Sequence, residues 1–496
     1  MKQLVRFKYE VLLALSVIVF IAFFSYLSIR RNLSLSSHYY DLGIMNQTVE
    51  NTKNGHFLEM TDQDLKKNVS RLAVHFDPIL AFFAPLYFIY DGPETLLVAQ
   101  IIIIGLGAVA VYMIAHHLLS KKLYAFIFAL SYLLYFPIER AILFDFHAVV
   151  LSTTFLLFAL YFGLVRRHGA SLIFIVLSLL TKENVGLVTF LYGFYLIFFR
   201  KERLWGSIIS IVSLLFFAGS FFVVIPYLRQ YQNHFALRYY GDFGDSPKQI
   251  ALSIFLNPIT TVKHLLTYAN ARYIFGLLFA HSLFILFSPI TFLIALPEFA
   301  LNLLSSNPNM KSIYFHYNSL LVPFIIFSSI SGFSTIMKRY NNKKIHVLSM
   351  SIFVGLSFIQ IYFFNPLPLP FLKEPYAFYP INHQKLTVLH NWQHVLQNED
   401  IKVSTTPRLA PFFTNRRYYY NFLFDPAYPS MGKVESDILK RIDNYTSADY
   451  LVLDMTEFTN EGQRDLLQKF YSHLKNNPSF KMIYKDGDIE VYKKQA

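Results

Sequence analysis

Cysteine is absent from the 496 residues of this chain, and charged residues make up only 15% of them. Without cysteine the chain has no disulfide bond, no thiolate metal ligand and no cysteine nucleophile. Soluble domains of average composition carry about 25% charged residues, so the shortage of charge indicates a protein that lies largely out of water. The sequence also lacks a Walker loop, a dinucleotide-binding fingerprint, an HExxH motif and an internal repeat.

Long apolar runs take the place of the missing charge. VLLALSVIVFIAFFSYLSI and LLVAQIIIIGLGAVAVYMIA have about the 20 residues that a helix needs to cross a bilayer. The first run is too long for a cleaved signal peptide, and SIRRN follows it where a small-residue cleavage site would stand. We expect an α-helical polytopic membrane protein with about eleven spans, near residues 9–29, 95–118, 123–138, 148–165, 171–181, 184–199, 205–226, 272–287, 289–304, 317–336 and 345–364.

Two stretches fit this scheme less simply. PILAFFAPLYFIY at 78–90 is short and contains two prolines, which favours an interfacial or re-entrant piece. Residues 272–304 carry no charge near Ser288-Pro289, where we divide them into two spans. Whether this stretch is one span or two stays open.

The net charge of +13 reflects the positive-inside rule and does not indicate a nucleic-acid partner. Short loops after the second, fourth and sixth spans carry pairs of Lys and Arg, as do the N-terminal residues and the loop at 338–344. Placing all of these groups in the cytoplasm requires an odd number of spans. The N-terminus is then cytoplasmic and the C-terminal part extracytoplasmic.

The last part of the chain has a different composition. After a proline-rich link, NPLPLPFLKEP, strand-like runs (IKVSTT, RRYYYNF, DYLVLD, FKMIYK) alternate with helical patterns (SDILKRIDNY, EGQRDLLQKFYSHLKNN), and the chain ends on a hairpin around Asp-Gly. We expect a transmembrane domain over 1–365, with a first external loop at 30–94, and a small extracytoplasmic α/β domain over 366–496.

With this topology, uncommon polar residues near the spans collect on the outer side. They come from the motifs HYYD, AVHFDP, LFDFHA, LTKENVG and YFHYNS, and they are Asp41, His75, Asp77, Asp145, His147, Lys182, Glu183 and His316. Ionisable residues at the edge of the hydrocarbon are costly and tend to mark functional sites. We therefore predict that these side chains line one outward-facing site.

Structural explanations compete with this interpretation. Asp41 could cap a helix that starts at Leu42, and Lys182 and Glu183 could form an ion pair in a turn. His75 and His316 could be interfacial histidines. The turn with Asp145 and His147 is the least easily explained by structure alone.

Transfer of a sugar from a lipid-phosphate donor would use this set of groups. A carboxylate could take the proton of an acceptor hydroxyl. Lys182, Arg71 or Arg140 could stabilise the charge that grows on the leaving phosphate. The apolar spans could hold the polyprenyl tail.

A resemblance supports this hypothesis. The stretches YYDLGIMNQTVENTKNGH, HFDPILAFFAPLYFIYDGPETLLVAQ, LFDFHA, LLTKENVG and HYNSLLVPFI resemble a family of bacterial and archaeal membrane proteins filed as a domain of unknown function. The similarity extends into the tail, at RLAPFFTNRRYYY and ADYLVLD. More distantly, that family resembles the GT-C glycosyltransferases, which include protein O-mannosyltransferases and lipid A aminoarabinose transferases.

The GT-C resemblance implies a catalytic role for Asp41, because these enzymes begin their first external loop with an acidic residue just after span one. Many of them carry a paired acidic motif there, whereas Leu42 follows Asp41. No cofactor is therefore assigned, and a divalent metal stays open.

The resemblance further implies a polyprenyl-phosphate-linked sugar as donor and a cell-envelope polymer or lipid as acceptor. The alternative is a transporter or flippase for a lipid-linked or envelope precursor. Transporters place charges near the midplane, often in repeated halves, and neither feature is visible here. A non-catalytic scaffold whose tail binds cell-wall polymer is a third interpretation.

Overall fold

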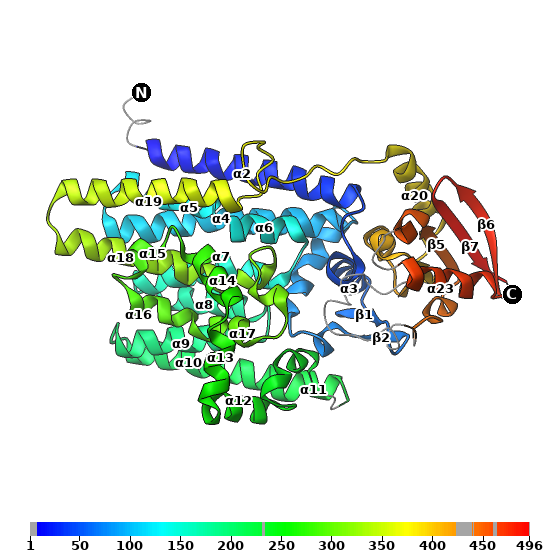
Figure 1. Cartoon of the computed structure of the whole chain (residues 1–496), viewed down its shortest axis with the longest axis horizontal. Coiled ribbons are helices and arrows are strands. Elements are labelled where there is room, and N and C mark those ends of the chain that lie inside the picture. Colours follow the sequence, from blue (N-terminus) through cyan, green and yellow to red (C-terminus); the bar gives the residue numbers. More distant parts are fainter. Residues whose placement is uncertain (1–6, 231–233, 423–438, 440, 460–463, 496) are drawn as a thin grey trace.

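The computed structural model describes residues 7–230, 234–422, 439, 441–459 and 464–495. A body of helices occupies most of the molecule, and a small sheet lies at one end of it (Figure 1). In the described residues, five helical segments are long and apolar enough to cross a membrane. They are α2 (Lys8–Leu33), α4 (Glu94–Leu119), α5 with α6 (Lys122–Leu133 and Phe136–Phe144), α10 with its extension to Leu228 (Arg203–Ala218, then η4, Gly219–Val224, and α11, Ile225–Leu228), and α19 (Lys343–Phe364).

Shorter apolar helices complete the body. α7 (Ala148–Leu164), α8 (His168–Leu179) and α9 (Val185–Phe198) lie where spans were predicted, and α18 (Val322–Arg339) precedes α19. α4 packs against α2, α5 and α7, and α9 packs along α10. The number of helices that cross the membrane is not fixed by these lengths, so the count of about eleven spans stays a prediction.

The region between α11 and α18 is more broken than the sequence suggested. It contains η5 (Phe235–Phe243), α12 (Pro247–Leu256), α13 (Pro258–Leu265), α14 (Tyr268–Leu278), α15 (Ser282–Ile285), α16 (Pro289–Phe292), η6 (Leu293–Ala295), α17 (Leu296–Leu304), η7 (Pro308–Lys311) and η8 (His316–Asn318). The chain does break at Ser288, whose φ of −147° and ψ of 56° are not helical, because the following proline disfavours the α conformation there.

The first external loop carries its own elements. They are η1, a π-helical turn (Tyr39–Gly43), α3 (Ile44–Lys53), the antiparallel strands β1 (Glu59–Asp62) and β2 (Lys67–Ser70), the short turn η2 (Arg71–Ala73) and the 3₁₀ helix η3 (Pro78–Phe88). Residues 78–90, predicted as an interfacial piece, therefore contain η3. Ile79 and Leu80 are buried, while Phe82 and Phe88 are exposed.

A five-stranded sheet forms the C-terminal part, in the order β4-β3-β5-β7-β6. Its strands are β3 (Val403–Thr405), β4 (Tyr419–Asn421), β5 (Tyr450–Asp454), β6 (Phe480–Asp486) and β7 (Ile489–Lys494), with α20 (His383–Val395), α21 (Ala410–Phe413) and α23 (Arg464–Lys475). β3 is parallel to β4 and β5, and β7 is antiparallel to β5 and β6. The predicted strands and terminal hairpin are present. Of the helix predicted over SDILKRIDNY (436–445), residues 436–438 and 440 lie outside the described residues. Residues 441–443 form a turn, and the 3₁₀ helix η11 (Asn444–Ser447) follows instead of an α-helix.

The external loop covers the edge of this sheet. Gln63 donates to the carbonyl of Tyr419 at 3.0 Å and accepts from the amide of Asn421 at 2.8 Å, so its side chain bonds edge strand β4 as a neighbouring strand would. Tyr39 stacks on Tyr419 with ring centroids 4.9 Å apart. Tyr39, Ile44 and Met60 also share one hydrophobic core with β3 and β4. The loop and the tail are therefore packed as one unit.

Candidate functional site

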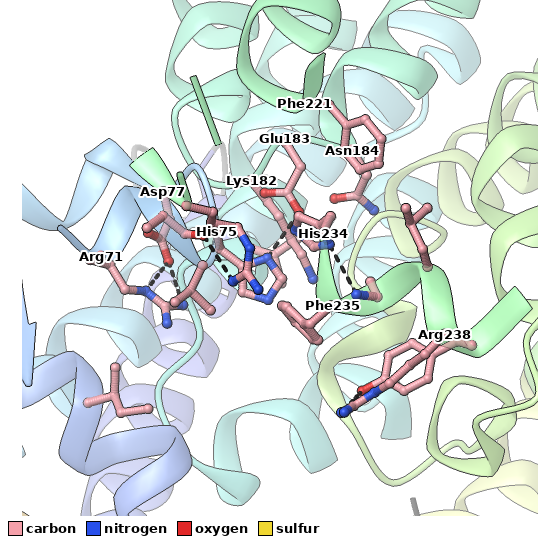
Figure 2. A pocket seen from close by; sticks show the side chains of 18 of the residues that line it. Arg71, His75, Asp77, Lys182, Glu183, Asn184, Phe221, His234, Phe235 and Arg238 are labelled. Carbon is pink, nitrogen blue, oxygen red and sulfur yellow. Dashed lines mark hydrogen bonds and ion pairs between the residues drawn. The ribbon is translucent and has the colours of Figure 1, made fainter. Parts of the chain in front are cut away.

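One cavity of about 1080 Å³ brings together residues that are far apart in the sequence. Its walls come from the external loop, the turns before α7 and α9, the segment from η4 to α12, the end of α17 and the turn η8 (Figure 2). Of the predicted residues, seven line it: Asp41, His75, Asp77, His147, Lys182, Glu183 and His316. Asp145 is not in its lining.

Asp41 is held by a histidine from another segment. Nε2 of His147 lies 3.0 Å from Oδ1 of Asp41, and the His147 ring stacks on His316 with centroids 3.7 Å apart. Burial would raise the pKa of Asp41, but the hydrogen bond and charge of His147 outweigh it and hold the pKa below its ordinary value. The side chain is 27% exposed, so an ionised carboxylate is accessible from the cavity.

The capping interpretation of Asp41 is wrong in this structure. The helix begins at Ile44 with Gly43 as its N-cap, and no side chain caps it. Asp41 belongs instead to the π-helical turn before it. Its carboxylate is directed to His147, which the sequence placed 106 residues away.

Asp145 has a structural partner beside the cavity. Its Oδ1 accepts hydrogen bonds of 2.7 Å from Arg31 and from Ser37, and only 2% of the side chain is exposed. Burial raises the pKa of Asp145 even though the Arg31 charge lowers it. Asp145 therefore ties the end of α2 to the turn that carries His147.

A buried ion pair forms the wall next to His75. Arg71 donates to Oδ2 of Asp77 from Nε at 3.1 Å and from Nη2 at 2.9 Å, as the dashed lines in Figure 2 show. Both side chains are about 95% buried. Arg71, proposed from sequence as a phosphate ligand, is thus neutralised by Asp77. Arg140, the other candidate, does not line the cavity and pairs with Glu374.

Glu183 joins two histidines. Its Oε1 lies 3.0 Å from Nδ1 of His75 and 3.7 Å from Nε2 of His234, and its Oε2 accepts from the amide of Phe76 at 3.0 Å. Burial would raise the pKa of Glu183, but His75 and Lys182 hold it well below its ordinary value. Burial lowers the pKa of His75, against the charge and the hydrogen bond of Glu183, which raise it.

Lys182 differs from Arg71, which Asp77 neutralises. Its Nζ lies 6.0 Å from the ring centroid of Tyr317. Within the part of the chain that the structure describes, no carboxylate lies at ion-pair distance from it, and Glu183 is turned toward His75. The ion pair between Lys182 and Glu183, which was the structural alternative to a role in the site, is therefore absent among the described contacts, and Lys182 offers the cavity a positive charge.

Several polar residues of the cavity were not predicted from the sequence, among them His234, Glu298 and Arg441. His234 lies in the segment after α11, Glu298 lies in α17 and accepts from Asn184 at 2.9 Å, and Arg441 comes from the C-terminal part, where it pairs with Asp64. His234 could have been found, because the predicted topology places the segment after span 205–226 on the outer side. Glu298 lies in an apolar run and Arg441 in a polar one, and no sequence pattern indicated that either residue belongs to the site.

A family model described as "Predicted membrane protein (DUF2079)" matches residues 31–491. A search of the curated proteins found no match. Among solved structures, the chain is similar to ArnT from Cupriavidus metallidurans bound to undecaprenyl phosphate, at 11% sequence identity and a TM-score of 0.52 over 98% of both chains.

A second similar structure is the archaeal oligosaccharyltransferase AglB from Archaeoglobus fulgidus, in complex with an inhibitory peptide and a dolichol-phosphate. It has 12% identity and a TM-score of 0.47, over 97% of this chain and 74% of that one. Both neighbours are GT-C glycosyltransferases. At such low identity, the similarity to ArnT establishes a likeness of fold.

Proposed function

Since the chain belongs to the DUF2079 family of predicted membrane proteins and is similar in fold to ArnT, we propose that it is a membrane glycosyltransferase. It moves a sugar from a polyprenyl-phosphate donor to an acceptor of the cell envelope, on the outer face of the membrane. The observation that carries this proposal is the presence of an accessible carboxylate, Asp41, and an unneutralised cation, Lys182, in one cavity.

Asp41 and Lys182 have different roles in the proposed reaction. Asp41 accepts the proton of the acceptor hydroxyl as that oxygen attacks the anomeric carbon, and His147 fixes the carboxylate through its bond to Oδ1. The bond from the anomeric carbon to the phosphate oxygen breaks, and the negative charge that grows on the phosphate is stabilised by Lys182. His75, Asp77, Glu183 and His316 shape the site around these atoms.

The cavity also suits a lipid-linked donor. Apolar side chains from the end of α10, from η4 and from α12 line the same space as the polar groups, among them Phe217, Phe221, Phe222, Ile250 and Ile254. A polyprenyl chain can lie against this apolar wall while its phosphate stays beside Lys182. The acceptor then approaches from the side of the external loop and Arg441.

Replacing Asp41 by Asn tests the proposal. Asn keeps the size of Asp but cannot accept a proton, so we expect sugar transfer to fall by roughly 100-fold or more, the usual contribution of a positioned base. The assay follows sugar from undecaprenyl-phosphate-linked monosaccharides to envelope material in membranes that contain equal amounts of each variant.

Asp91→Asn is the matched control, because Asp91 is an external carboxylate of the same loop that does not line the cavity. It should transfer sugar normally. Full activity of Asp41→Asn would exclude a catalytic role for Asp41. Transport of a lipid-linked precursor without any transfer would return the transporter interpretation to first place.

A further inference from the structure

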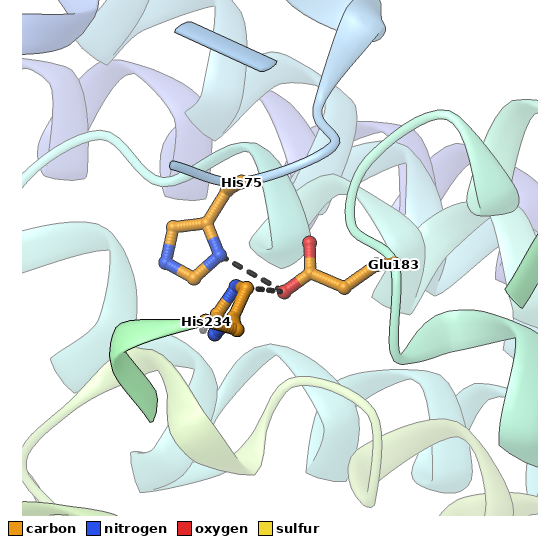
Figure 3. Close-up of side chains that lie close together, drawn as sticks. All are labelled: His75, Glu183 and His234. Carbon is orange, nitrogen blue, oxygen red and sulfur yellow. Dashed lines mark hydrogen bonds and ion pairs between the residues drawn. The ribbon is translucent and has the colours of Figure 1, made fainter. Parts of the chain in front are cut away.

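We infer that His75, Glu183 and His234 form a binding site for a divalent transition metal, with Zn²⁺ as the best match. The three side chains come from the external loop, from the turn before α9 and from the start of η5. Figure 3 shows both imidazole rings directed at the same carboxylate oxygen of Glu183. Their ligand atoms all lie within 4.8 Å of one another. The cluster lines the same cavity as the proposed transferase site and shares His75 and Glu183 with it, but metal binding there does not depend on sugar transfer.

The donor set fits zinc. Two imidazoles and one carboxylate are a known ligand combination for Zn²⁺, with bonds of about 2.0–2.2 Å, and imidazole nitrogen is a donor that zinc, copper and nickel prefer over calcium or magnesium. In a tetrahedral site such bonds place neighbouring donor atoms roughly 3.3–3.5 Å apart. Glu183 Oε1 lies 3.0 Å from His75 and 3.7 Å from His234. All three donor atoms lie within 4.8 Å of one another, so the two imidazole nitrogens would have to move closer together when the metal binds.

His234 is buried, with 3% of its side chain exposed. Its Nε2 lies 3.7 Å from Oε1 of Glu183, which is longer than a hydrogen bond. A metal ion between these two atoms would bind both of them and would place a positive charge beside the Glu183 carboxylate.

The turn after His234 responds to the metal. Ala236 N–H donates to Nδ1 of His234 at 3.1 Å, so a neutral ring carries its proton on Nε2. Ligation by Nε2 displaces that proton to Nδ1, which then no longer accepts the bond from Ala236 N–H. The start of η5 must shift when the metal binds, and with it Phe235 and Arg238, which line the cavity.

Three protein ligands leave a fourth position for water or an anion, as in catalytic zinc sites. The neighbouring cation is Lys182, which lines the same cavity. The metal thus joins three segments at the cavity wall and keeps one coordination position open toward it.

Zinc binding to the full-length chain tests this inference. The chain is purified in detergent with an affinity tag that contains no histidine, stripped with EDTA and titrated with Zn²⁺ by calorimetry. We expect one zinc ion per chain. X-ray absorption at the zinc edge should show two imidazole ligands and oxygen ligands, a readout that needs no variant. Absence of binding, or a spectrum without imidazole, overturns the inference.

Variants then locate the ion. His234→Ala and Glu183→Gln should each weaken zinc binding by roughly 100-fold or more, since even indirect partners of a metal contribute about 10–100-fold. His316→Gln is the matched control, because His316 lines the same cavity outside this cluster. Unchanged affinity in a folded His234→Ala variant places the ion elsewhere and also overturns the inference. Hydrogen exchange at the start of η5 should change with zinc in the unmodified chain.

The two proposals fail separately. Loss of zinc binding without loss of sugar transfer leaves the transferase intact. If the chain binds zinc but transfers no sugar, the proposed transferase function is rejected and the metal site is supported.

Discussion

Lys182 lines the cavity, and its Nζ lies 6.0 Å from the ring centroid of Tyr317. Among the described residues, no carboxylate lies at ion-pair distance from it. A phosphate oxygen is the natural partner for such a group, because hydrogen bonds between charged partners are about twice as strong as neutral ones. The role of Lys182 therefore concerns donor binding more than proton transfer.

Lys182→Met should raise the KM for the polyprenyl-phosphate donor by about tenfold or more, equivalent to the 1.5–3 kcal/mol of a hydrogen bond to a charged group. Lys182→Arg keeps the charge and should retain most of the affinity. The measurement is the dependence of transfer on donor concentration. An unchanged KM in Lys182→Met would exclude a contact with the donor phosphate.

The shifted pKa of a second residue, Glu50, predicts how the stability of the fold depends on pH. Glu50 in α3 is buried near Asp91 and Lys53. Burial and Asp91 raise the pKa of Glu50 from 4.5 to about 7. Since the folded chain holds this proton more tightly than the unfolded chain, the stabilisation is complete below about pH 4.5 and is lost as the pH rises through about 7.

The melting temperature should therefore fall between about pH 5 and about pH 8, and Glu50→Gln should reduce that fall by about 2–4 °C, the effect of about 1 kcal/mol in a medium-sized domain. Thermal unfolding in detergent at a series of pH values measures it. Glu59→Gln, at another carboxylate of the external loop, serves as the control. An identical pH profile in Glu50→Gln would contradict the assignment.

At the scale of elements, α9 and α10 are brought together by small residues. A Cβ at Gly193 would lie 2.6 Å from the carbonyl oxygen of Gly206, and a Cβ at Gly206 would lie 2.6 Å from that of Gly193. Neither backbone oxygen can move without moving its helix. Small residues at such contacts let helix backbones approach closely in membranes.

Gly193→Ala should therefore destabilise the chain by about 1–3 kcal/mol, the usual cost of overpacking. Gly169→Ala is the matched control in α8, because no atom lies within 4 Å of its Cβ position, and alanine there gains helix propensity. Thermal unfolding of both variants in detergent compares them. Equal stability of the two would mean that the helices separate without cost.

At the scale of the whole molecule, the polar cavity and the basic loops lie apart. The connection between α18 and α19 lies at the end of the helical body opposite the sheet (Figure 1). The helix ends on either side of it carry four basic residues, Lys338, Arg339, Lys343 and Lys344. The positive-inside rule places this end in the cytoplasm, and we expect the sheet and the cavity on the outer side.

Because the chain has no cysteine, single cysteines report this orientation directly. Lys481→Cys in β6 should react with a membrane-impermeant maleimide on intact cells, whereas Lys201→Cys between α9 and α10 should react only after lysis. Both side chains are exposed in the structure, so burial does not explain a difference. The reverse pattern would overturn the topology and the outer-face site.

Several features were accessible to sequence reasoning because they depend on local pattern. Apolar runs about 20 residues long indicated a membrane protein, and alternating residues around Asp486-Gly487 indicated the β6–β7 hairpin. Motifs at the outer ends of predicted spans identified seven of the cavity residues. These predictions needed only the length, composition and order of neighbouring residues.

The partners of those residues could not be read in this way. Asp41 meets His147, Asp145 meets Arg31, and Glu183 meets His75, each across more than 100 residues. Sequence order does not say which of several turns at the same membrane face will touch. Asp145 was therefore expected in the site with His147, two residues along the chain, although only His147 lines the cavity.

The sequence by itself determined the class of the protein and the strands of its tail, and it predicts the side of the membrane on which its chemistry is proposed, because hydropathy and charge act through local composition. The tertiary structure alone decided which charges are neutralised and which are not. Arg71 is paired by Asp77, while Lys182 stays available and His234 joins Glu183. These outcomes depend on distances of a few ångströms between segments, and only the packing of helices, loop and sheet sets them.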